Sequence, residues 1–196
     1  MRYIVWDTSC VSEELALADM DRAITATQAI VAGIRDEQWA APTPCTGVDV
    51  RTLVNHLVIG NLHFAALVNR TPVPDRDADH LGSDPLGAFG RAAAELREAY
   101  AKPGVLTQTY EAPFGTAPGV ALVRARIVEH LGHGWDLARA TGQPADFPDD
   151  VVERALAAAR LLPRPEGPGA PFGAEVPVPA DAPAIDRFAG FLGRAV

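Results

Sequence analysis

The segment 119–141 constrains the fold of this chain most, because it is a long run of helical periodicity without a proline. One of its faces carries apolar residues, mostly small, at both ends and polar residues in the middle. This face consists of Leu122, Ala125, Glu129, His133, Asp136 and Ala140. Gly142 and Pro144 then follow, as is typical of a helix end. A buried carboxylate needs a compensating partner, so the segment predicts a packed helix that carries a polar site.

Two interpretations of the polar stretch follow from the spacing. Residues four apart on a helix have Cβ atoms about 5–6 Å apart, so Glu129 and His133 can reach one cation together. Alternatively, Glu129 pairs with Arg126 or Arg124, and Asp136 satisfies the imidazole of His133. Spacing alone favours the second interpretation, because Glu-x-x-x-His is a weak motif.

Breaks rich in proline and glycine divide the rest of the chain into further helices and one extended excursion, 105–118. After a tail at 1–11, the sequence predicts a single domain at 12–196 that includes a Pro/Gly-rich loop at 163–183. The helices are expected at about 12–33, 50–69 with Asp49 as N-cap, 85–101 after Asp84, 119–141, from Asp149 or Asp150 to 162, and 183–194. Four longer helices and one extended crossover predict an all-α four-helix bundle with additional C-terminal helices.

Several other side chains are candidates for a site. His56 lies on an apolar stripe of the second helix, where an imidazole is more often a hydrogen-bonded core residue than a ligand. His63, two turns further on, is expected to pack or to support a ligand. His130 competes with His133 as a ligand but lies less well on the polar face. Cys45 follows a proline, and we expect a small buried core cysteine rather than a ligand or a reactive thiol.

Composition excludes some classes of function. The formal net charge of −8 argues against nucleic acid as a partner, because phosphate-backbone binding needs a basic surface. No run reaches the roughly 18 apolar residues that a membrane helix needs, so no membrane association is expected. The two cysteines, Cys10 and Cys45, do not make a disulfide framework, and we expect a cytoplasmic protein.

Several segments together resemble a known family. They are PTPCTGVDVRTLVNHLV at 42–58, EHLGHGWDLARATG at 129–142, PFG at 113–115, VPVPADAP at 176–183 and FLGR at 191–194. The chain resembles the short actinobacterial metal-binding proteins related to the mycothiol-dependent maleylpyruvate isomerase N-terminal domain, within the DinB-like superfamily of four-helix bundles. Val48 stands where that family usually has tryptophan, which alters the wall beside the start of the second helix.

The resemblance implies a divalent-metal triad of His56, Glu129 and His133. Zinc is the expected ion, and nickel, iron or manganese also suit two imidazoles and a carboxylate. Three protein ligands leave positions open, as in catalytic zinc sites. Asp136 then either fixes the imidazole tautomer or faces Arg139 in solvent.

The resemblance further implies a metal-dependent thiol transferase or isomerase. Such an enzyme activates a low-molecular-weight thiol, of which mycothiol is the family's example, toward a small electrophile. A non-catalytic metal sensor or structural module is one alternative, and a metal-dependent hydrolase is another. Dimerisation is common in the superfamily, so a homodimer is an expectation.

Overall fold

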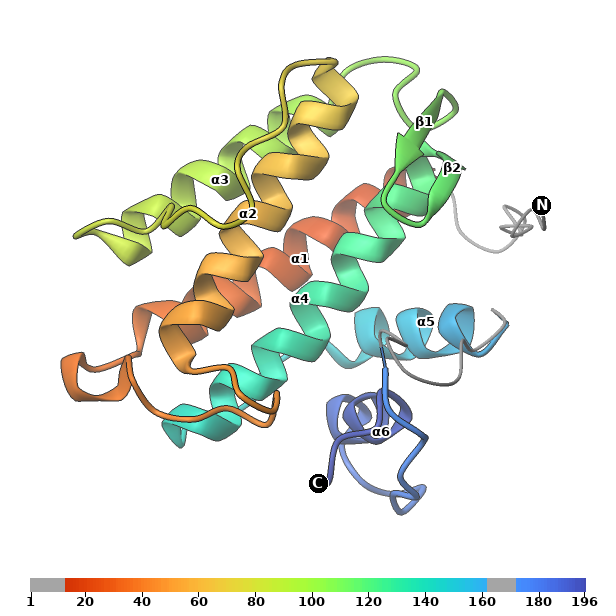
Figure 1. The fold of residues 1–196 in the computed structure, drawn as a ribbon. Helices are drawn as coiled ribbons and strands as arrows, with labels where there is room; N and C mark the ends of the chain where they lie inside the picture. Colours follow the sequence, from red (N-terminus) through yellow and green to blue (C-terminus); the bar gives the residue numbers. More distant parts are fainter. Residues whose placement is uncertain (1–12, 162–171) are drawn as a thin grey trace.

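The computed structural model describes residues 13–161 and 172–196, and in this part the protein is helical apart from one hairpin (Figure 1). The elements are α1 (Glu13–Ala32), a 3₁₀ turn (Asp36–Gln38), α2 (Val50–Asn69), α3 (Pro85–Tyr100), β1 (Thr109–Ala112), β2 (Gly115–Pro118), α4 (Gly119–Thr141), α5 (Asp149–Arg160) and α6 (Ala184–Phe191). The predicted all-α bundle with additional C-terminal helices is therefore confirmed. The tail at 1–11, Cys10 and part of the loop at 163–183 lie outside the described residues.

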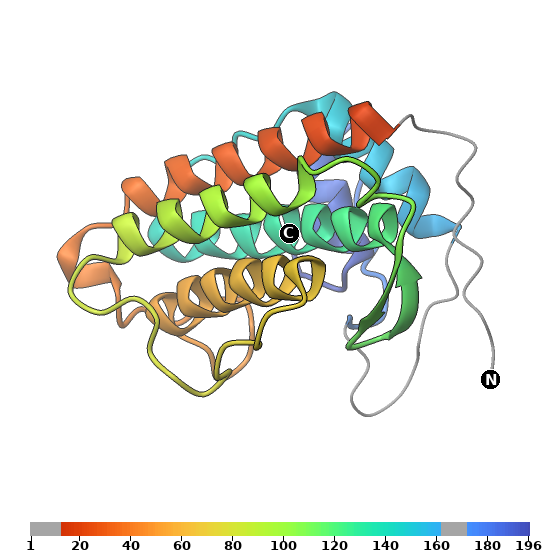
Figure 2. The same cartoon turned by 90° about the horizontal axis from the view of Figure 1, so that it is seen from above.

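The bundle consists of α1, α2, α3 and α4, which lie side by side in Figure 2. Helices α2 and α3 pack on each other, and so do α1 and α4. Because α2 and α3 run in the same direction, the connection 70–84 returns along the length of the bundle (Figure 2). The expected extended excursion at 105–118 contains the antiparallel hairpin, in which Thr109 pairs with Pro118 and Ala112 with Gly115.

Most helix ends follow the predicted chemistry. The Asp49 carboxylate accepts a hydrogen bond from the Thr52 backbone N–H at 2.8 Å, and Asp84 caps α3 in the same way. Gly142 ends α4 with a φ of 67°, which is the left-handed cap that glycine adopts without strain.

The two C-terminal helices differ from prediction at their ends. Helix α5 begins at Asp149, and its N-cap is Pro148 rather than either aspartate. Both carboxylates therefore lie in the first turn, where the helix dipole favours negative charge. Helix α6 covers Ala184–Phe191 and is shorter than the expected 183–194, because the chain turns at Gly193 with a φ of 89°.

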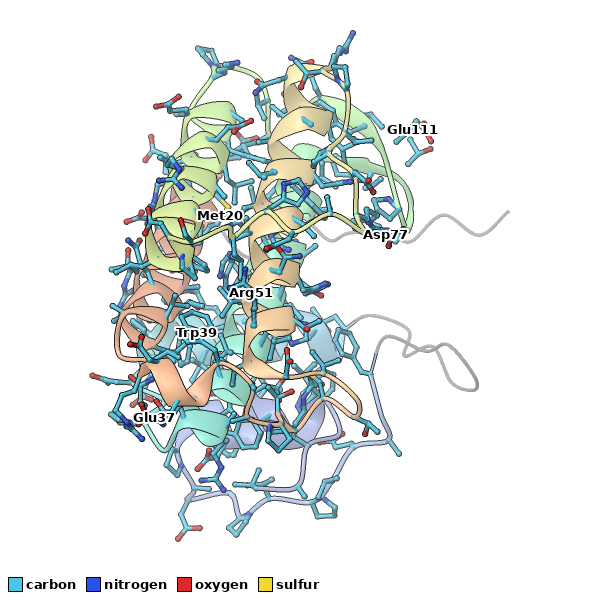
Figure 3. The ribbon with its side chains drawn as sticks, turned by 60° about the vertical axis from the view of Figure 1, so that its left-hand side comes forward. Met20, Glu37, Trp39, Arg51, Asp77 and Glu111 are labelled. Carbon is cyan, nitrogen blue, oxygen red and sulfur yellow. The ribbon has the colours of Figure 1, made fainter. Side chains whose placement is uncertain are left out.

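The core lies between the four long helices and is apolar over most of its length. Met20 is buried among the helices, whereas Glu37 and Glu111 project from the surface (Figure 3). Helix α6 docks on α4 through a hydrogen bond from Trp135 Nε1 to Asp186 Oδ1 at 2.8 Å. Helix α4 thus contacts the bundle on one side and the C-terminal segment on the other. No helix in the described ranges combines the length and apolarity needed to cross a bilayer.

Candidate functional site

Helices α2 and α4 bring three of the predicted side chains together. His56 Nε2 lies 2.9 Å from Glu129 Oε2, and His133 Nε2 lies 3.5 Å from the same oxygen. The three atoms all lie within 4.8 Å of one another. Both imidazoles therefore point their Nε2 atoms at one carboxylate oxygen, from two different helices.

The group is open on one side. The side chain of His56 is 51% exposed, that of Glu129 29% and that of His133 18%. The two imidazole rings meet edge to face, with centroids 5.0 Å apart. Solvent and small molecules can therefore approach from the side of His56.

The charges within the group stabilise one another. Burial raises the pKa of Glu129, but hydrogen bonds from His133 and His56 outweigh it and hold that pKa well below 4.5. Burial lowers the pKa of His133, but its contacts with Asp136, Cys45 and Glu129 raise it to about 11. His133 is therefore an imidazolium at neutral pH, and a metal ion that bound at Nε2 would displace a proton.

The other nitrogen of His133 faces a second set of side chains. Its Nδ1 lies 3.1 Å from Asp136 Oδ2, and the Cys45 thiol donates to the same oxygen at 3.1 Å. Asp136 is fully buried, and the guanidinium of Arg194 donates to it from Nη2 at 2.9 Å and from Nε at 3.2 Å. Asp136 therefore fixes the orientation of the His133 ring, whereas Arg139 lies over the ring of Trp135.

Cys45 packs against the core but is only half-buried, and its thiol lies beside His133, so the expectation of a buried core cysteine holds in part. The cause is the loop before α2. A β-bridge between Pro42 and Asp49 closes this loop and directs the thiol toward α4. A hollow of about 260 Å³ lies on the same loop, and Val48 is part of its wall. A larger hollow of about 390 Å³ lies between α5 and residues 175–180, and neither hollow has any of the three clustered side chains in its lining.

His130 lies in a different polar group. It is fully buried, and its Nε2 lies 2.9 Å from Asn61 Oδ1, which also accepts from Arg126 Nη2 at 2.9 Å. The guanidinium of Arg126 fits against α2 because residue 60 is glycine, whose Cβ, if present, would lie 2.5 Å from Arg126 Nη1. His130 therefore does not compete with His133, because it points into the core.

The alternative pairing predicted from the spacing, in which Glu129 pairs with an arginine and Asp136 satisfies His133, is also partly present in the structure. Arg126 Nη1 lies 4.0 Å from Glu129 Oε2, and Asp136 contacts His133. These contacts do not replace the cluster, because Glu129 and His133 make them in addition to their contacts with each other. His63 is buried against Phe64, and among the described residues its ring nitrogens have no hydrogen-bond partner.

The donor set of His56, Glu129 and His133 suits a divalent cation. Ligand atoms about 2.1 Å from a tetrahedral zinc lie about 3.4 Å apart. Here the carboxylate oxygen lies 2.9 Å and 3.5 Å from the two imidazole nitrogens, and all three atoms lie within 4.8 Å of one another. Cys45, His133 and Asp136 also lie within 4.8 Å of one another, but Arg194 already neutralises the carboxylate in that set. The cluster that includes Glu129 is therefore the better cation site.

Sequence reasoning missed two participants, Asn61 and Arg194. Asn61 was not noticed because it lies beside the histidine stripe of α2 and matches no ligand motif. Arg194 lies 58 residues from Asp136, so no helical spacing connects them. The resemblance included Arg194 within the FLGR segment, and that was the available signal.

Residues 20–138 match the family model described as the mycothiol maleylpyruvate isomerase N-terminal domain. The chain belongs to this family. Two proteins of Mycobacterium tuberculosis, from two strains and both described as uncharacterized, are 38% identical to it over 177 residues. The alignment covers 89% of this chain and 95% of each relative. The similarity to these two relatives therefore extends over nearly the whole chain.

Two solved structures share the fold of this family member. The mycothiol-dependent maleylpyruvate isomerase has a TM-score of 0.63 at 15% identity, over 76% of this chain and 69% of the other. A histidine-to-alanine mutant of that isomerase gives the same TM-score at 14% identity, with the same coverage. At this identity the likeness establishes the architecture of the bundle.

Proposed function

We propose that the protein binds a divalent metal ion and uses it to activate a low-molecular-weight thiol for reaction with a small electrophile. The observation that carries the proposal is the convergence of two imidazoles and one carboxylate on a partly exposed spot between α2 and α4. Membership of a family named for a mycothiol-dependent isomerase supports the thiol as the co-substrate. Zinc is the ion that this donor set favours most simply.

The residues of the chain have separate tasks in this proposal. His56, Glu129 and His133 hold the ion, which when bound supplies Lewis acidity that favours the thiolate form of a thiol. Three ligands leave room for an incoming group on the side of His56, where the imidazole is half exposed. Asp136 holds the Nδ1 proton of His133, so that Nε2 faces the ion.

In this proposal the reactants occupy the hollow beside Val48. It is lined by the loop before α2 and by Thr52, one helical turn before His56. The same loop carries Cys45, which contacts His133.

The test is consumption of an electrophile by zinc-loaded protein, with and without mycothiol. Maleylpyruvate is one substrate to try, together with other small electrophiles that carry an activated double bond. We expect turnover that requires both metal and thiol, and that Glu129→Gln abolishes. Turnover without thiol would instead indicate a hydrolase. Metal-loaded protein that consumes no electrophile, and whose metal accepts no added ligand, would indicate a structural module.

A further inference from the structure

Among the described residues, Asp136 is the only one whose carboxylate contacts His133 Nδ1. The other partners of that carboxylate come from distant parts of the chain. Its carboxylate is buried and receives hydrogen bonds from Cys45 and from Arg194. Cys45 precedes α2, whereas Arg194 follows α6. The orientation of one cluster residue thus depends on the C-terminal segment.

The contact of Arg194 with Asp136 is bidentate. Nη2 donates to Oδ2 at 2.9 Å and Nε donates to Oδ1 at 3.2 Å, so the planar guanidinium meets both carboxylate oxygens. Nη1 also donates to the backbone carbonyl of Leu192 at 3.0 Å, which fixes the side chain against its own backbone. Only 13% of the Arg194 side chain is exposed. This geometry holds Asp136 in one position.

Helix α4 is shaped to receive this segment. A Cβ at Gly132 would lie 2.8 Å from Leu192 Cδ1, so the glycine allows the segment to approach closely. Trp135 fixes the start of α6 through its hydrogen bond to Asp186. The C-terminal segment is therefore attached to α4 beside Asp136.

We propose that Arg194 is a positioning residue for the metal site, which orients the ligand His133 through Asp136. The proposal rests on the proposed function, because it assumes that His133 binds a metal ion. Without the guanidinium, the buried Asp136 carboxylate loses its only cation besides His133 among the described residues. The carboxylate is then free to turn away, and it holds the imidazole less firmly.

The alternative role for Arg194 is simple attachment of the C-terminal segment. Arg187 offers a matched control, since it also attaches this segment, through the Glu153 carboxylate and the Ala182 carbonyl. Arg187 touches none of the residues around His133. A merely structural role for Arg194 predicts that both arginines affect thermal stability and that neither affects metal affinity.

The experiment measures zinc affinity by competition with a chromophoric chelator, together with thermal unfolding. The variants are Arg194→Met, Arg194→Lys, Arg187→Met, Asp136→Asn and the double variant Asp136→Asn with Arg194→Met. We expect Arg194→Met to weaken zinc binding about 10- to 100-fold, in the range for partners that orient metal ligands. Arg194→Lys should recover part of the loss, since it restores the charge but not the bidentate geometry. Arg187→Met should change affinity by less than about threefold.

The double variant decides whether Arg194 acts through Asp136. In the Asp136→Asn background, Arg194→Met should cause no further loss of zinc affinity. A full additional loss would overturn the proposal, and so would unchanged affinity in a folded Arg194→Met protein.

Wild-type protein that binds no zinc would contradict the proposed function itself, whereas tight zinc binding unaffected by Arg194→Met would contradict this inference alone. If Arg194→Met does not fold, Arg194→Lys and Asp136→Asn are compared in its place: a loss for both supports the proposal, and no loss for Asp136→Asn overturns it.

Discussion

Helix α4 carries two pairs of polar residues at the same spacing, and they have different environments. Glu129 and His133 are four residues apart, and so are Arg126 and His130. Each pair meets a polar residue of α2, which is His56 for the first pair and Asn61 for the second. The first pair is partly exposed and contains a carboxylate, whereas the second is buried and contains a cation.

The two pairs have the same spacing, so the spacing does not determine the role of the histidine in each. The charge of its partners and their exposure determine that role. On the proposed function, the carboxylate between two imidazoles attracts a metal ion. A guanidinium beside an imidazole repels one, and it makes the imidazole a neutral hydrogen-bonding group.

The largest effect is expected from the carboxylate of the first pair. Glu129→Gln should weaken zinc binding by about 100-fold or more, since it removes the only anionic ligand of the cluster. His130→Gln, in the second pair, should change affinity by less than about threefold. Competition with a chelator measures both. Equal losses in the two variants would mean that the pairs are not functionally distinct.

The second pair should contribute to how stability depends on pH in metal-free protein, together with His63, whose pKa burial also lowers, and with His133, whose raised pKa acts in the opposite sense. Burial, and then the charge of Arg126, holds the pKa of His130 well below 6.5, so the unfolded chain binds this proton more readily. The stabilisation is therefore fully present above pH 6.5 and is lost as the pH falls, by up to about 1.4 kcal/mol per pH unit. Urea unfolding between pH 7 and pH 5 measures the slope. His130→Gln should flatten it, and an unchanged slope would contradict the assignment.

A smaller effect is expected at the glycine that makes room for Arg126. Gly60→Ala should destabilise the protein by about 1 kcal/mol, because the new Cβ would lie 2.5 Å from Arg126 Nη1. In an Arg126→Met background the same change should be neutral or stabilising, since alanine favours a helix over glycine by about 1 kcal/mol. Urea unfolding of the four proteins tests this. An identical cost in both backgrounds would show that the guanidinium is not the obstacle.

The smallest effect is expected at Cys45. Its uncharged thiol donates one hydrogen bond to the Asp136 carboxylate, whereas the charged guanidinium of Arg194 donates two. Cys45→Ser should therefore change zinc affinity by less than about threefold. A loss as large as that of Glu129→Gln would make Cys45 a metal ligand, and the preferred donor set would then be wrong.

Much of the fold was predictable from the sequence because its signals are local. Prolines, capping aspartates and the glycine at 142 mark helix ends, and apolar stripes mark the faces that pack. The course of the 70–84 connection was not predictable, because helix direction within a bundle depends on contacts between distant segments. The resemblance suggested His56, Glu129 and His133 as one group, and the structure brings them together.

The surroundings of the group were harder to predict. Helical periodicity suggested His130 as a competitor, but only the position of Asn61 and Arg126 shows that its ring points inward. Arg194 reaches Asp136 because Gly132 lets α6 and the following residues approach α4. Such contacts between distant residues leave no periodic pattern in a single sequence.

The most direct test of the central claim is cobalt binding followed by absorption spectroscopy, with mycothiol then added. The account predicts that one cobalt ion binds to wild type and to Cys45→Ala, and that mycothiol gives a sulfur-to-cobalt charge-transfer band in both. The same band in both proteins would mean that the sulfur comes from the added thiol and that the ion has an open position. Absence of cobalt binding, or bound cobalt whose spectrum mycothiol leaves unchanged, would contradict the account.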